Sequence, residues 1–360
     1  MRILHLNDRF GTRGGADWHL LGILSEQSRT HEIVLAAGRK DSAGDPPCTF
    51  RLVGGLDSRT EYPVDLDALF DEICPDIIHV HNVMNPIALA QAASRGAVMT
   101  VQDHRSFCPG RGKLTLLGAQ CTETMNETLC ADCFEDPAYG ASIWQLTRSR
   151  LEQVQRMRRL FVLSEYMKRE LMAVGVSNST IHIIPPFVHG LDLDAPAAGP
   201  PCVLFVGRLV EHKGVDDAIA AWRGSGVDLP LVFAGTGPAR PRLEEAGFDC
   251  TGWLDHAQLS AVYRRARLVI LSSRWQEPFG IVGLEAATLG IPVVSWQSGG
   301  VEDWYQGPQI AWGDTQALAA EIRRGVAGEL PVPDPPPGAE PMMNLLEAAY
   351  GHVVEPDLNR

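Results

Sequence analysis

The chain has 360 residues, of which 45% are hydrophobic and 21% are charged, and its formal net charge is −13. This length suffices for two domains with full cores. The acidic charge argues against wholesale binding to nucleic acid or to an anionic membrane, and no apolar run approaches the length of a membrane span. The amino terminus lacks the apolar core and cleavage site of a signal peptide, so we expect a cytoplasmic location.

Short apolar runs alternate with helical patterns along the whole chain. Strands are predicted at residues 2–6, 32–36, 49–53, 77–80, 97–101, 160–163, 181–184, 202–206, 230–234, 268–271 and 292–295. Helical patterns fill most of the intervals, including 16–27, 65–73, 141–158, 214–224, 256–266 and 280–289. Such alternation is typical of parallel sheets with helices on both faces.

A proline- and alanine-rich run at residues 191–201 interrupts this alternation and is typical of a linker. We therefore predict two α/β domains, over residues 1–187 and 188–341, followed by a helix within 342–360 that packs back on the first domain. In open parallel sheets, ligands bind beyond the carboxyl ends of the strands, so a cleft between the two domains is the expected site.

The first predicted strand leads into a glycine-rich loop at the start of a helix. The backbone N–H groups of a helix start suit an anion or the polar edge of a sugar, although Gly14 and Gly15 are equally compatible with a simple tight turn. Neither this loop nor Gly235-Thr236-Gly237 has the G-x-G-x-x-G spacing of a dinucleotide site, which counts against a dehydrogenase.

Polar residues follow the strand predicted at 97–101. Asp103 and His104 stand there at the expected mouth of the cleft, where they are suited to binding an acceptor hydroxyl or to assisting its proton transfer. A histidine in such a place is more often a structural hydrogen-bonding group, so His104 alone is weak evidence of catalysis.

Half of the eight cysteines cluster in a loop-like insert over residues 108–133, namely Cys108, Cys121, Cys130 and Cys133. A C-x-x-C pair with two further cysteines is able to form a tetrahedral structural zinc site. The insert has few apolar residues, so a metal would stabilise it. Four thiols in a reduced compartment are the alternative, and the spacing leaves both interpretations open.

Basic residues gather in the helical pattern that precedes the strand at 160–163, namely Arg148, Arg150, Arg156, Arg158 and Arg159. Such a segment is suited to peripheral contact with an anionic membrane or with a phosphorylated acceptor. Apolar residues at helical spacing favour the simpler interpretation of an amphipathic core helix with a solvated basic face.

Two cations, Arg208 and Lys213, follow the strand at 202–206 and therefore stand at a strand's carboxyl end. An Arg fork pairs with a diphosphate in bidentate fashion, and a Lys adds a point charge. Most Arg and Lys residues are merely solvated surface cations. The position of these two favours a functional role.

The segment from Glu277 to Glu285 places two carboxylates eight positions apart, one in the loop after a strand and one inside the next helix. Gly280 and Gly283 are predicted to let a ligand approach the backbone closely where that helix begins. A helix start is a natural seat for phosphate, and carboxylates suit the hydroxyls of a sugar or a ribose.

Taken together, these residues resemble the retaining nucleotide-sugar glycosyltransferases of family 4, over nearly the whole chain. The segments that carry the resemblance are Gly14-Gly15-Ala16-Asp17, Leu163-Ser164-Glu165-Tyr166, Gly207-Arg208 with Lys213-Gly214, Phe233 to Pro238, Gly252-Trp253-Leu254, Glu277 to Glu285 as an E-x₇-E motif, Gly290 to Val294, and Gly299-Gly300. The resemblance implies the α/β GT-B fold, in which two Rossmann-like doubly wound domains face a deep interdomain cleft.

The resemblance also implies roles for individual residues. The catalytic residues would be Arg208, Lys213, Glu277, Asp103 and His104. The donor-binding residues would be Gly14, Gly15, Gly207, Arg208, Lys213, Gly235, Trp253, Leu254, Glu277, Phe279, Gly280, Ile281, Val282 and Glu285. The basic pair would hold the donor diphosphate, Glu285 would accept hydrogen bonds from the ribose, and Glu277 would accept them from the donor sugar.

The reaction implied by the resemblance is transfer of a hexose from a nucleotide sugar, with UDP favoured, to a glycan, lipid-linked or small-molecule acceptor. The positive groups take the place of a divalent metal, so no cofactor is expected for catalysis. A structural zinc in the insert stays one of the two open interpretations of its cysteines. Two departures are notable: the family often has His-Asp where this chain has Gln102-Asp103, and Pro186 to His189 replace the usual Asn-Gly-Val-Asp. The alternatives are a nucleotide-sugar epimerase of related shape and a nucleotide-binding scaffold without turnover.

Overall fold

The structure, a computed structural model, describes residues 1–42 and 44–354. The chain forms two compact units: the first contains residues 1–116, 122–189 and the carboxyl-terminal part from Pro337, and the second contains residues 117–121 and 190–336. The borders between the units therefore fall at 189/190 and 336/337, where the sequence predicts 187/188 and 341/342. Of the predicted final helix, residues 355–360 lie outside the described part of the chain.

The first unit is built on a seven-stranded sheet with the order β3-β2-β1-β4-β5-β6-β7, in which all neighbours are parallel. Its strands are β1 (Arg2–Phe10), β2 (Glu32–Lys40), β3 (Thr49–Leu52), β4 (Ile77–Val80), β5 (Val98–Val101), β6 (Arg159–Val162) and β7 (Ile181–Ile183). The strand order reverses between β1 and β4, which makes the carboxyl end of that pair the natural place for a ligand.

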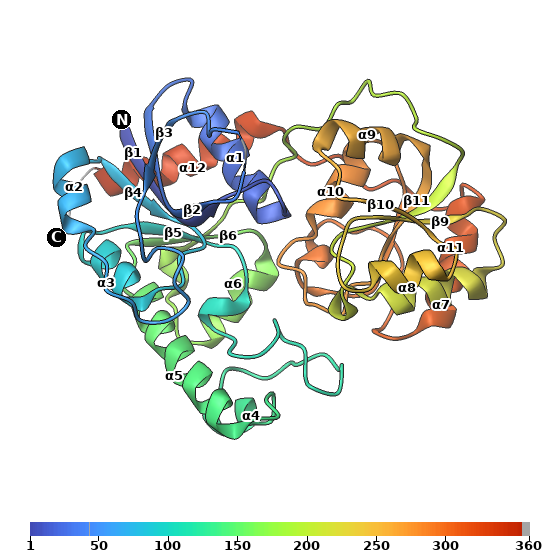
Figure 1. The fold of residues 1–360 in the computed structure, drawn as a ribbon, viewed down its shortest axis with the longest axis horizontal. Helices are drawn as coiled ribbons and strands as arrows, with labels where there is room; N and C mark the ends of the chain where they lie inside the picture. The colour runs from blue at the N-terminus through green and yellow to red at the C-terminus, as the bar shows by residue number, and fades with distance from the viewer. Residues whose placement is uncertain (43, 355–360) are drawn as a thin grey trace. The chain divides into compact units, whose positions relative to one another are not determined.

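Helices cover both faces of this sheet (Figure 1). Apolar residues of α1 (Gly15–Gln27) and α12 (Ala339–Val354) pack in one cluster. The opposite cluster contains residues of α2 (Asp67–Ile73), α3 (Pro86–Ser94), α5 (Pro137–Val154) and α6 (Glu165–Ala173). Short segments complete the unit: η1 (His104–Ser106), α4 (Glu127–Ala131) and η2 (Asn178–Thr180). The red α12 thus joins the blue elements from the start of the chain, as Figure 1 shows.

The second unit repeats this plan with a five-stranded parallel sheet in the order β10-β9-β8-β11-β12. Its strands are β8 (Cys202–Val206), β9 (Leu231–Ala234), β10 (Asp249–Gly252), β11 (Ala266–Leu271) and β12 (Val293–Ser295). Its helices are η3 (Glu211–Lys213), α7 (Val215–Ser225), α8 (Arg240–Glu245), α9 (His256–Arg265), α10 (Ile281–Thr288), η4 (Gly299–Asp303) and α11 (Thr315–Val326). Here the strand order reverses between β8 and β11.

All of the strands predicted from the sequence are present, with shifts at their ends. The strands β1 and β2 extend to Phe10 and Lys40 because these two strands keep pairing with each other beyond the end of β4. The sequence did not predict β10, whose residues Asp-Cys-Thr-Gly carry little strand propensity and lie at the edge of the sheet.

The prediction of a helix over 141–158 is wrong at both ends. The helix α5 begins at Pro137, because the Asp136 side chain accepts hydrogen bonds from two backbone N–H groups of the first turn, and it ends at Val154. The basic side chains do not all form a solvated face, since Arg150 is buried and donates to the carbonyl oxygens of Met84 and Arg59. None of the helices in the described ranges is both long and apolar enough to cross a bilayer.

Candidate functional site

The predicted donor-binding residues of the second unit gather at one edge of its sheet. The loops that follow β8, β9, β11 and β12 all leave the carboxyl ends of parallel strands, and the reversal of strand order lies between β8 and β11. Arg208 and Lys213 come from the first of these loops, and Glu277 comes from the third. This is the place where an open parallel sheet binds its ligand.

The loop after β8 is fixed against the loop after β11. Gly214 has φ 70°, and a Cβ there would lie 1.6 Å from the carbonyl oxygen of Ser272, so no other residue fits. The Ser272 hydroxyl donates to the Gly214 carbonyl at 2.7 Å. Gly235, after β9, is equally confined, because a Cβ there would lie 1.9 Å from the Gly207 carbonyl oxygen. These glycines serve the packing of the site's own loops.

Lys213 and Glu277 form an ion pair, with 2.6 Å between Nζ and Oε1. Their side chains are 22% and 14% exposed, so both groups remain in reach of a ligand. The carbonyl of His212 accepts the N–H groups of Arg274 and Trp275 at 2.9 and 3.0 Å, which holds the turn before Lys213 against the loop of Glu277. The two charges are therefore brought together by backbone contacts.

Arg208 is exposed, and one of its guanidinium nitrogens lies 3.4 Å from Nε2 of His212. Its side chain extends from the same turn that carries Lys213. The exposed guanidinium and the half-buried ammonium therefore present two positive groups on one loop, an arrangement suited to a diphosphate.

Ser298 holds the backbone of Glu277 in place, and the sequence did not single it out. Its hydroxyl accepts the N–H of Glu277 at 3.2 Å and donates to the carbonyl of Trp275 at 3.0 Å. The N–H of Gly300 donates to the Glu277 carbonyl at 2.7 Å. The predicted Gly299-Gly300 pair follows Ser298 directly. The segment after β12 therefore holds the loop of Glu277 in place, in addition to the loop after β8.

The start of α10 corrects the interpretation of its glycines. Gly280 precedes the helix with φ 90°, as a left-handed turn requires. A Cβ on Gly283, however, would lie 1.9 Å from the Trp304 ring, and the indole N–H of Trp304 donates to the Phe279 carbonyl at 2.6 Å. The missing side chain of Gly283 thus makes room for Trp304, and the prediction that it admits a ligand is wrong.

Glu285 lies one turn into α10 and is buried at 7% exposure. Its Oε2 accepts the Tyr263 hydroxyl at 2.7 Å, and its Oε1 lies 4.0 Å from Nε2 of His256. Burial raises the pKa of Glu285 to about 7, although the hydrogen bond from Tyr263 opposes this shift. The sequence did not predict that Tyr263 and His256 lie beside Glu285, because both residues come from α9, which meets α10 only in the folded chain.

The other predicted donor-binding residues of this unit lie in the first turn of α10, close to Glu285 in the chain, or directly after β10. Ile281 and Val282 are half-buried in the first turn of α10, where the Val282 carbonyl lies 3.4 Å from the Tyr263 hydroxyl. Trp253 is 45% exposed, whereas Leu254 packs against the apolar cluster that contains Tyr263. Trp253 is thus the large aromatic side chain that this part of the unit offers to a ligand.

In the first unit, the loop of Gly14 and Gly15 is organised by the buried carboxylate of Asp17, the last residue of the Gly14-Gly15-Ala16-Asp17 segment. Asp17 is 4% exposed, accepts the N–H of Arg13 at 3.0 Å and pairs with the Arg9 guanidinium at 3.3 Å. Gly14 has an extended backbone, and a Cβ there would meet no atom within 4 Å. The fold itself therefore does not require glycine at this position.

Asp103 and His104 differ in their surroundings. Asp103 is partly exposed, and its carboxylate accepts the backbone N–H and the Nε of Arg105 at 2.9 and 2.8 Å. His104 is 1% exposed and its Nε2 lies 2.9 Å from the Tyr166 hydroxyl, so its burial does not favour direct contact with an acceptor. Beside them, Gln102 donates its amide N–H to Nδ1 of the buried His19 at 3.2 Å.

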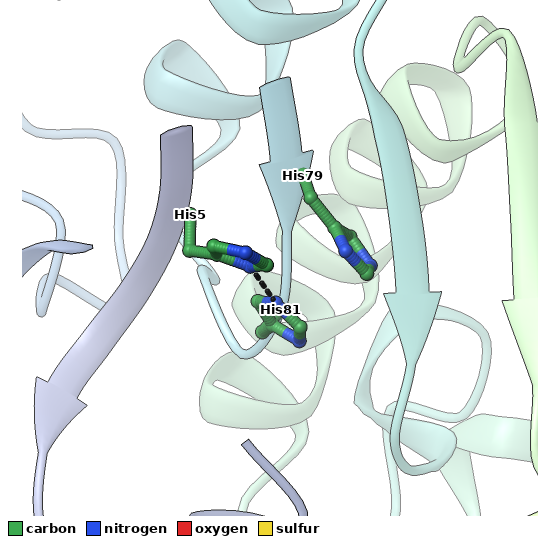
Figure 2. A group of neighbouring side chains, drawn as sticks. All are labelled: His5, His79 and His81. Carbon is green, nitrogen blue, oxygen red and sulfur yellow. Dashed lines mark hydrogen bonds between the residues drawn. The ribbon is translucent and has the colours of Figure 1, made fainter. Parts of the chain in front are cut away.

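The described residues also contain a group of three histidines whose ring nitrogens lie within 4.8 Å of one another, and the sequence did not predict it. His5 on β1 is opposite His79 on β4, and His81 follows β4, as Figure 2 shows. All three rings are at most 1% exposed. This is the kind of cluster in which a metal ion would be sought.

Hydrogen bonds account for five of the six ring nitrogens in this group, and Nδ1 of His81 has no hydrogen-bond partner among the described residues. Because Gln27 accepts from Nε2 of His5 at 2.8 Å, Nδ1 of His5 must accept from Nε2 of His81 at 2.9 Å. The Gln27 amide donates to the Tyr350 hydroxyl at 3.4 Å, which in turn lies 2.7 Å from Nδ1 of His79. Nε2 of His79 lies 2.7 Å from the Thr100 hydroxyl. These contacts form one continuous chain of hydrogen bonds from His81 to Thr100.

The first unit is expected to lose stability in acid because of these histidines. Burial lowers the pKa of His5 to about 4 and the pKa values of His79 and His81 well below the ordinary 6.5. Below pH 6.5 the unfolded chain therefore binds more protons than the folded chain. The contribution of these histidines to the free energy of unfolding is complete above pH 6.5 and is lost as the pH falls from 6.5 towards 4. Urea unfolding of Glu285→Gln, which lacks the opposing titration of that buried carboxyl group, at pH 7.5 and 5.5 measures the effect. Equal unfolding free energies of this variant at the two values would contradict it.

Two family models match the chain. "Glycosyltransferase Family 4" matches residues 13–189, and "Glycosyl transferases group 1" matches residues 194–329. The first match covers residues of the first unit together with residues 117–121, and the second match falls within the second unit. Together they include the glycine-rich loop of the first unit and the Lys213–Glu277 site of the second.

Among curated proteins, glycogen synthase of Mycobacterium tuberculosis is 38% identical over 143 residues, 36% of this chain and 34% of that protein. The 2-deoxystreptamine N-acetyl-D-glucosaminyltransferase of Niallia circulans is 29% identical over 191 residues, 49% of this chain and 48% of that protein. The chain therefore spans between about a third and a half of the length of these relatives.

Solved structures match nearly the whole chain. Sucrose-phosphate synthase of Thermosynechococcus elongatus has a TM-score of 0.66 and 17% identity, with 98% of each chain covered. Anabaena HepE in complex with UDP has a TM-score of 0.66 and 15% identity, with 98% of this chain and 100% of that chain covered. At such identities the likeness concerns the fold, and it confirms the predicted GT-B class. The chain therefore belongs to the glycosyltransferases that combine a family 4 domain with a group 1 domain.

Proposed function

We propose that the protein is a retaining glycosyltransferase that takes a hexose from a nucleotide sugar, with a UDP-sugar favoured, and transfers it to an acceptor hydroxyl without a divalent metal. The observation that carries the proposal is the Lys213–Glu277 ion pair at the carboxyl edge of the second sheet. It joins a cation suited to the leaving diphosphate with a carboxylate suited to sugar hydroxyls.

Charge governs the proposed reaction. Breaking the bond between the sugar and the diphosphate builds negative charge on the leaving group, and Lys213, Arg208 and the N–H groups at the start of α10 stabilise it. Glu277 positions the sugar hydroxyls, and Glu285 accepts hydrogen bonds from the ribose. The acceptor oxygen attacks the face that the diphosphate leaves, and a phosphate oxygen takes the acceptor's proton.

The donor half of the proposal is supported by two observations. The buried Glu285, oriented by Tyr263, offers a hydrogen-bond acceptor of the kind that a ribose diol requires. Anabaena HepE, which shares the fold, has been solved with UDP and with UDP-glucose. The acceptor that we propose is a hydroxyl of a glycan, a lipid-linked sugar or a small molecule. In the first unit, we propose that the partly exposed Asp103 lies close to the bound acceptor.

The proposal is tested by ligand binding and product analysis. UDP, GDP, ADP and their sugars are screened by thermal shift, with UDP compounds expected to raise the melting temperature most, since a ligand of the native state stabilises it. Turnover of the best donor is then followed by NMR without added metal. A product of inverted anomeric configuration, or a rate that requires added Mg²⁺ or Mn²⁺, contradicts the proposal. Epimerised donor without acceptor indicates an epimerase, and binding without turnover indicates a scaffold.

Substitution of Gly14 by alanine is expected to leave the melting temperature unchanged and to lower kcat/KM about tenfold. The added methyl group meets no protein atom within 4 Å, so only a bound ligand would be displaced by it. The matched control is Gly54→Ala, whose methyl group also meets nothing within 4 Å, and which is expected to change neither quantity. Wild-type turnover in Gly14→Ala would show that this loop does not contact a substrate.

A further inference from the structure

The cysteines of the insert over residues 108–133 are not arranged as a metal site in the described part of the chain. No three of their sulfurs lie within 4.8 Å of one another, so the zinc predicted there stays a prediction. The polar side chains that the fold does bring together, and that the proposed function leaves without a role, are His19 and Gln102 of the first unit.

His19 lies at the carboxyl edge of the first sheet, although it belongs to a helix. It stands one turn into α1, and its Nδ1 lies 3.2 Å from the amide nitrogen of Gln102, which directly follows β5. The contact joins the helix after β1 to the end of β5, and β4 lies between these two strands. The strand order reverses between β1 and β4, so His19 lies where such a sheet binds its ligand.

The imidazole ring of His19 is enclosed, but its Nε2 is open. The residue is 5% exposed, and the Phe187 ring meets it edge-on with 6.5 Å between the ring centroids. Nε2 has no hydrogen-bond partner among the residues that the structure describes, and it is not one of the fully enclosed side-chain atoms that lack a partner. The exposed part of His19 therefore includes Nε2.

Gln102 fixes the position of the ring proton. Its amide nitrogen only donates, so Nδ1 of His19 accepts the hydrogen bond and the proton of the neutral ring lies on Nε2. Burial lowers the pKa of His19 to about 4, although the hydrogen bond from Gln102 opposes this shift, so the ring is neutral near pH 7. The open Nε2–H is therefore a hydrogen-bond donor with a fixed direction.

His19 has neighbours that are already expected to bind a substrate. Gly15 is four positions earlier in α1, which places it on the same face of the helix. Asp103 follows Gln102 directly, and its carboxylate is partly exposed. A sugar hydroxyl both donates and accepts hydrogen bonds, so a carboxylate and an imidazole N–H at one edge of the sheet are complementary to it.

We propose that His19 is a further substrate-binding residue, whose Nε2–H donates a hydrogen bond to a hydroxyl oxygen of the acceptor while Gln102 orients the ring. This inference rests on the proposed transfer to an acceptor hydroxyl. The ring keeps its proton throughout, so His19 binds and positions the acceptor. The proton of the attacking hydroxyl still moves to the phosphate oxygen.

The first test compares the acceptor kinetics of variants of the full-length protein. His19→Phe keeps a ring beside Phe187 but has no N–H, and it is expected to lower kcat/KM for the acceptor about tenfold, the equivalent of one hydrogen bond. His19→Gln returns an N–H near the position of Nε2 and should recover to within a factor of about three of the wild type. His31→Phe, directly before β2 at the opposite edge of the sheet, is the control and should match the wild type.

The affinity for UDP, measured by calorimetry, should be the same in His19→Phe as in the wild type, because the proposed nucleotide site belongs to the second unit. A purely structural role of His19 would instead change UDP affinity and acceptor kinetics together. Wild-type kcat/KM in His19→Phe, or an equal loss in His19→Phe and His19→Gln, would overturn this inference alone. Absence of transfer by the wild type would overturn the proposed function as well.

A second measurement, on the protein without substrates, does not depend on turnover. ¹⁵N NMR of histidine-labelled protein at pH 7 should show the His19 ring, identified by its loss in His19→Phe, as the neutral tautomer with the proton on Nε2. In Gln102→Met, which keeps the length of the side chain and removes the donor, this preference for one tautomer should weaken. A charged ring, a proton on Nδ1, or an unchanged preference in Gln102→Met would overturn the proposal.

Discussion

Replacement of Lys213 by alanine is expected to lower kcat/KM for sugar transfer by about 10²–10³-fold, the cost typical of removing one group that stabilises charge in a transition state. The ammonium lies at the carboxyl end of β8, 2.6 Å from Glu277, and is the less exposed of the two cations on its loop. Its effect should appear chiefly in kcat, because the diphosphate gains negative charge as the sugar bond breaks.

The loss must be separated from damage to the fold, because Lys213→Ala leaves the Glu277 carboxylate without its ion-pair partner. The double variant Lys213→Ala with Glu277→Gln removes that unpaired charge, so it should regain stability but not activity. Lys40→Ala, at an exposed ion pair of the first unit, is the control and should keep wild-type activity. Activity of Lys213→Ala within a factor of a few of the wild type would contradict the role.

Replacement of Glu285 by glutamine is expected to weaken UDP binding at pH 8 by about 10–100-fold, the equivalent of one hydrogen bond to a charged group. The amide keeps an oxygen for the Tyr263 hydroxyl but no longer offers a carboxylate to the ribose. Because the pKa of Glu285 is raised to about 7, the wild type should itself bind UDP more weakly as the pH falls from 8 to 6, and Glu285→Gln should not respond.

The same substitution should stabilise the protein without ligand. A carboxyl group whose pKa rises on folding from 4.5 to about 7 favours the folded state fully below pH 4.5, and this contribution is lost as the pH rises through 7. Glu285→Gln should therefore raise the melting temperature at pH 8, whereas the exposed Glu244→Gln should not. Calorimetry of UDP binding and thermal melts at pH 6 and 8 measure both effects. Equal melting temperatures of the wild type and Glu285→Gln at pH 8 would show that the buried Glu285 carboxylate does not destabilise the folded protein.

The sequence predicted the strands, and the charged residues at their ends, better than the contacts that hold those residues in place. Apolar runs predicted the buried parallel strands, and Lys213 and Glu277 could be placed at strand ends because a strand's direction fixes which residues reach the edge. The contact between Tyr263 and Glu285 could not be predicted, because it joins two helices whose packing arises only in the folded unit.

Glycines show the same limit. A sequence gives the position of a missing side chain but not the group that occupies its space. Gly283 was therefore assigned to a ligand, although it accommodates Trp304, and Gly14, where nothing in the fold requires glycine, remains a candidate for ligand contact. The three buried histidines escaped prediction for a related reason, since their link through Gln27 and Tyr350 joins distant parts of the chain.

The packing of α12 beside α1 has a practical consequence for domain exchange. Because the carboxyl-terminal residues from Pro337 belong to the first unit, the second unit apart from residues 117–121 is an internal segment of the chain over residues 190–336. A chimera that exchanges donor specificity should replace this segment as a cassette with two junctions. A chain cut before α12 would uncover the apolar surface that Met342, Leu346 and Tyr350 now cover, and it should be recovered as aggregate.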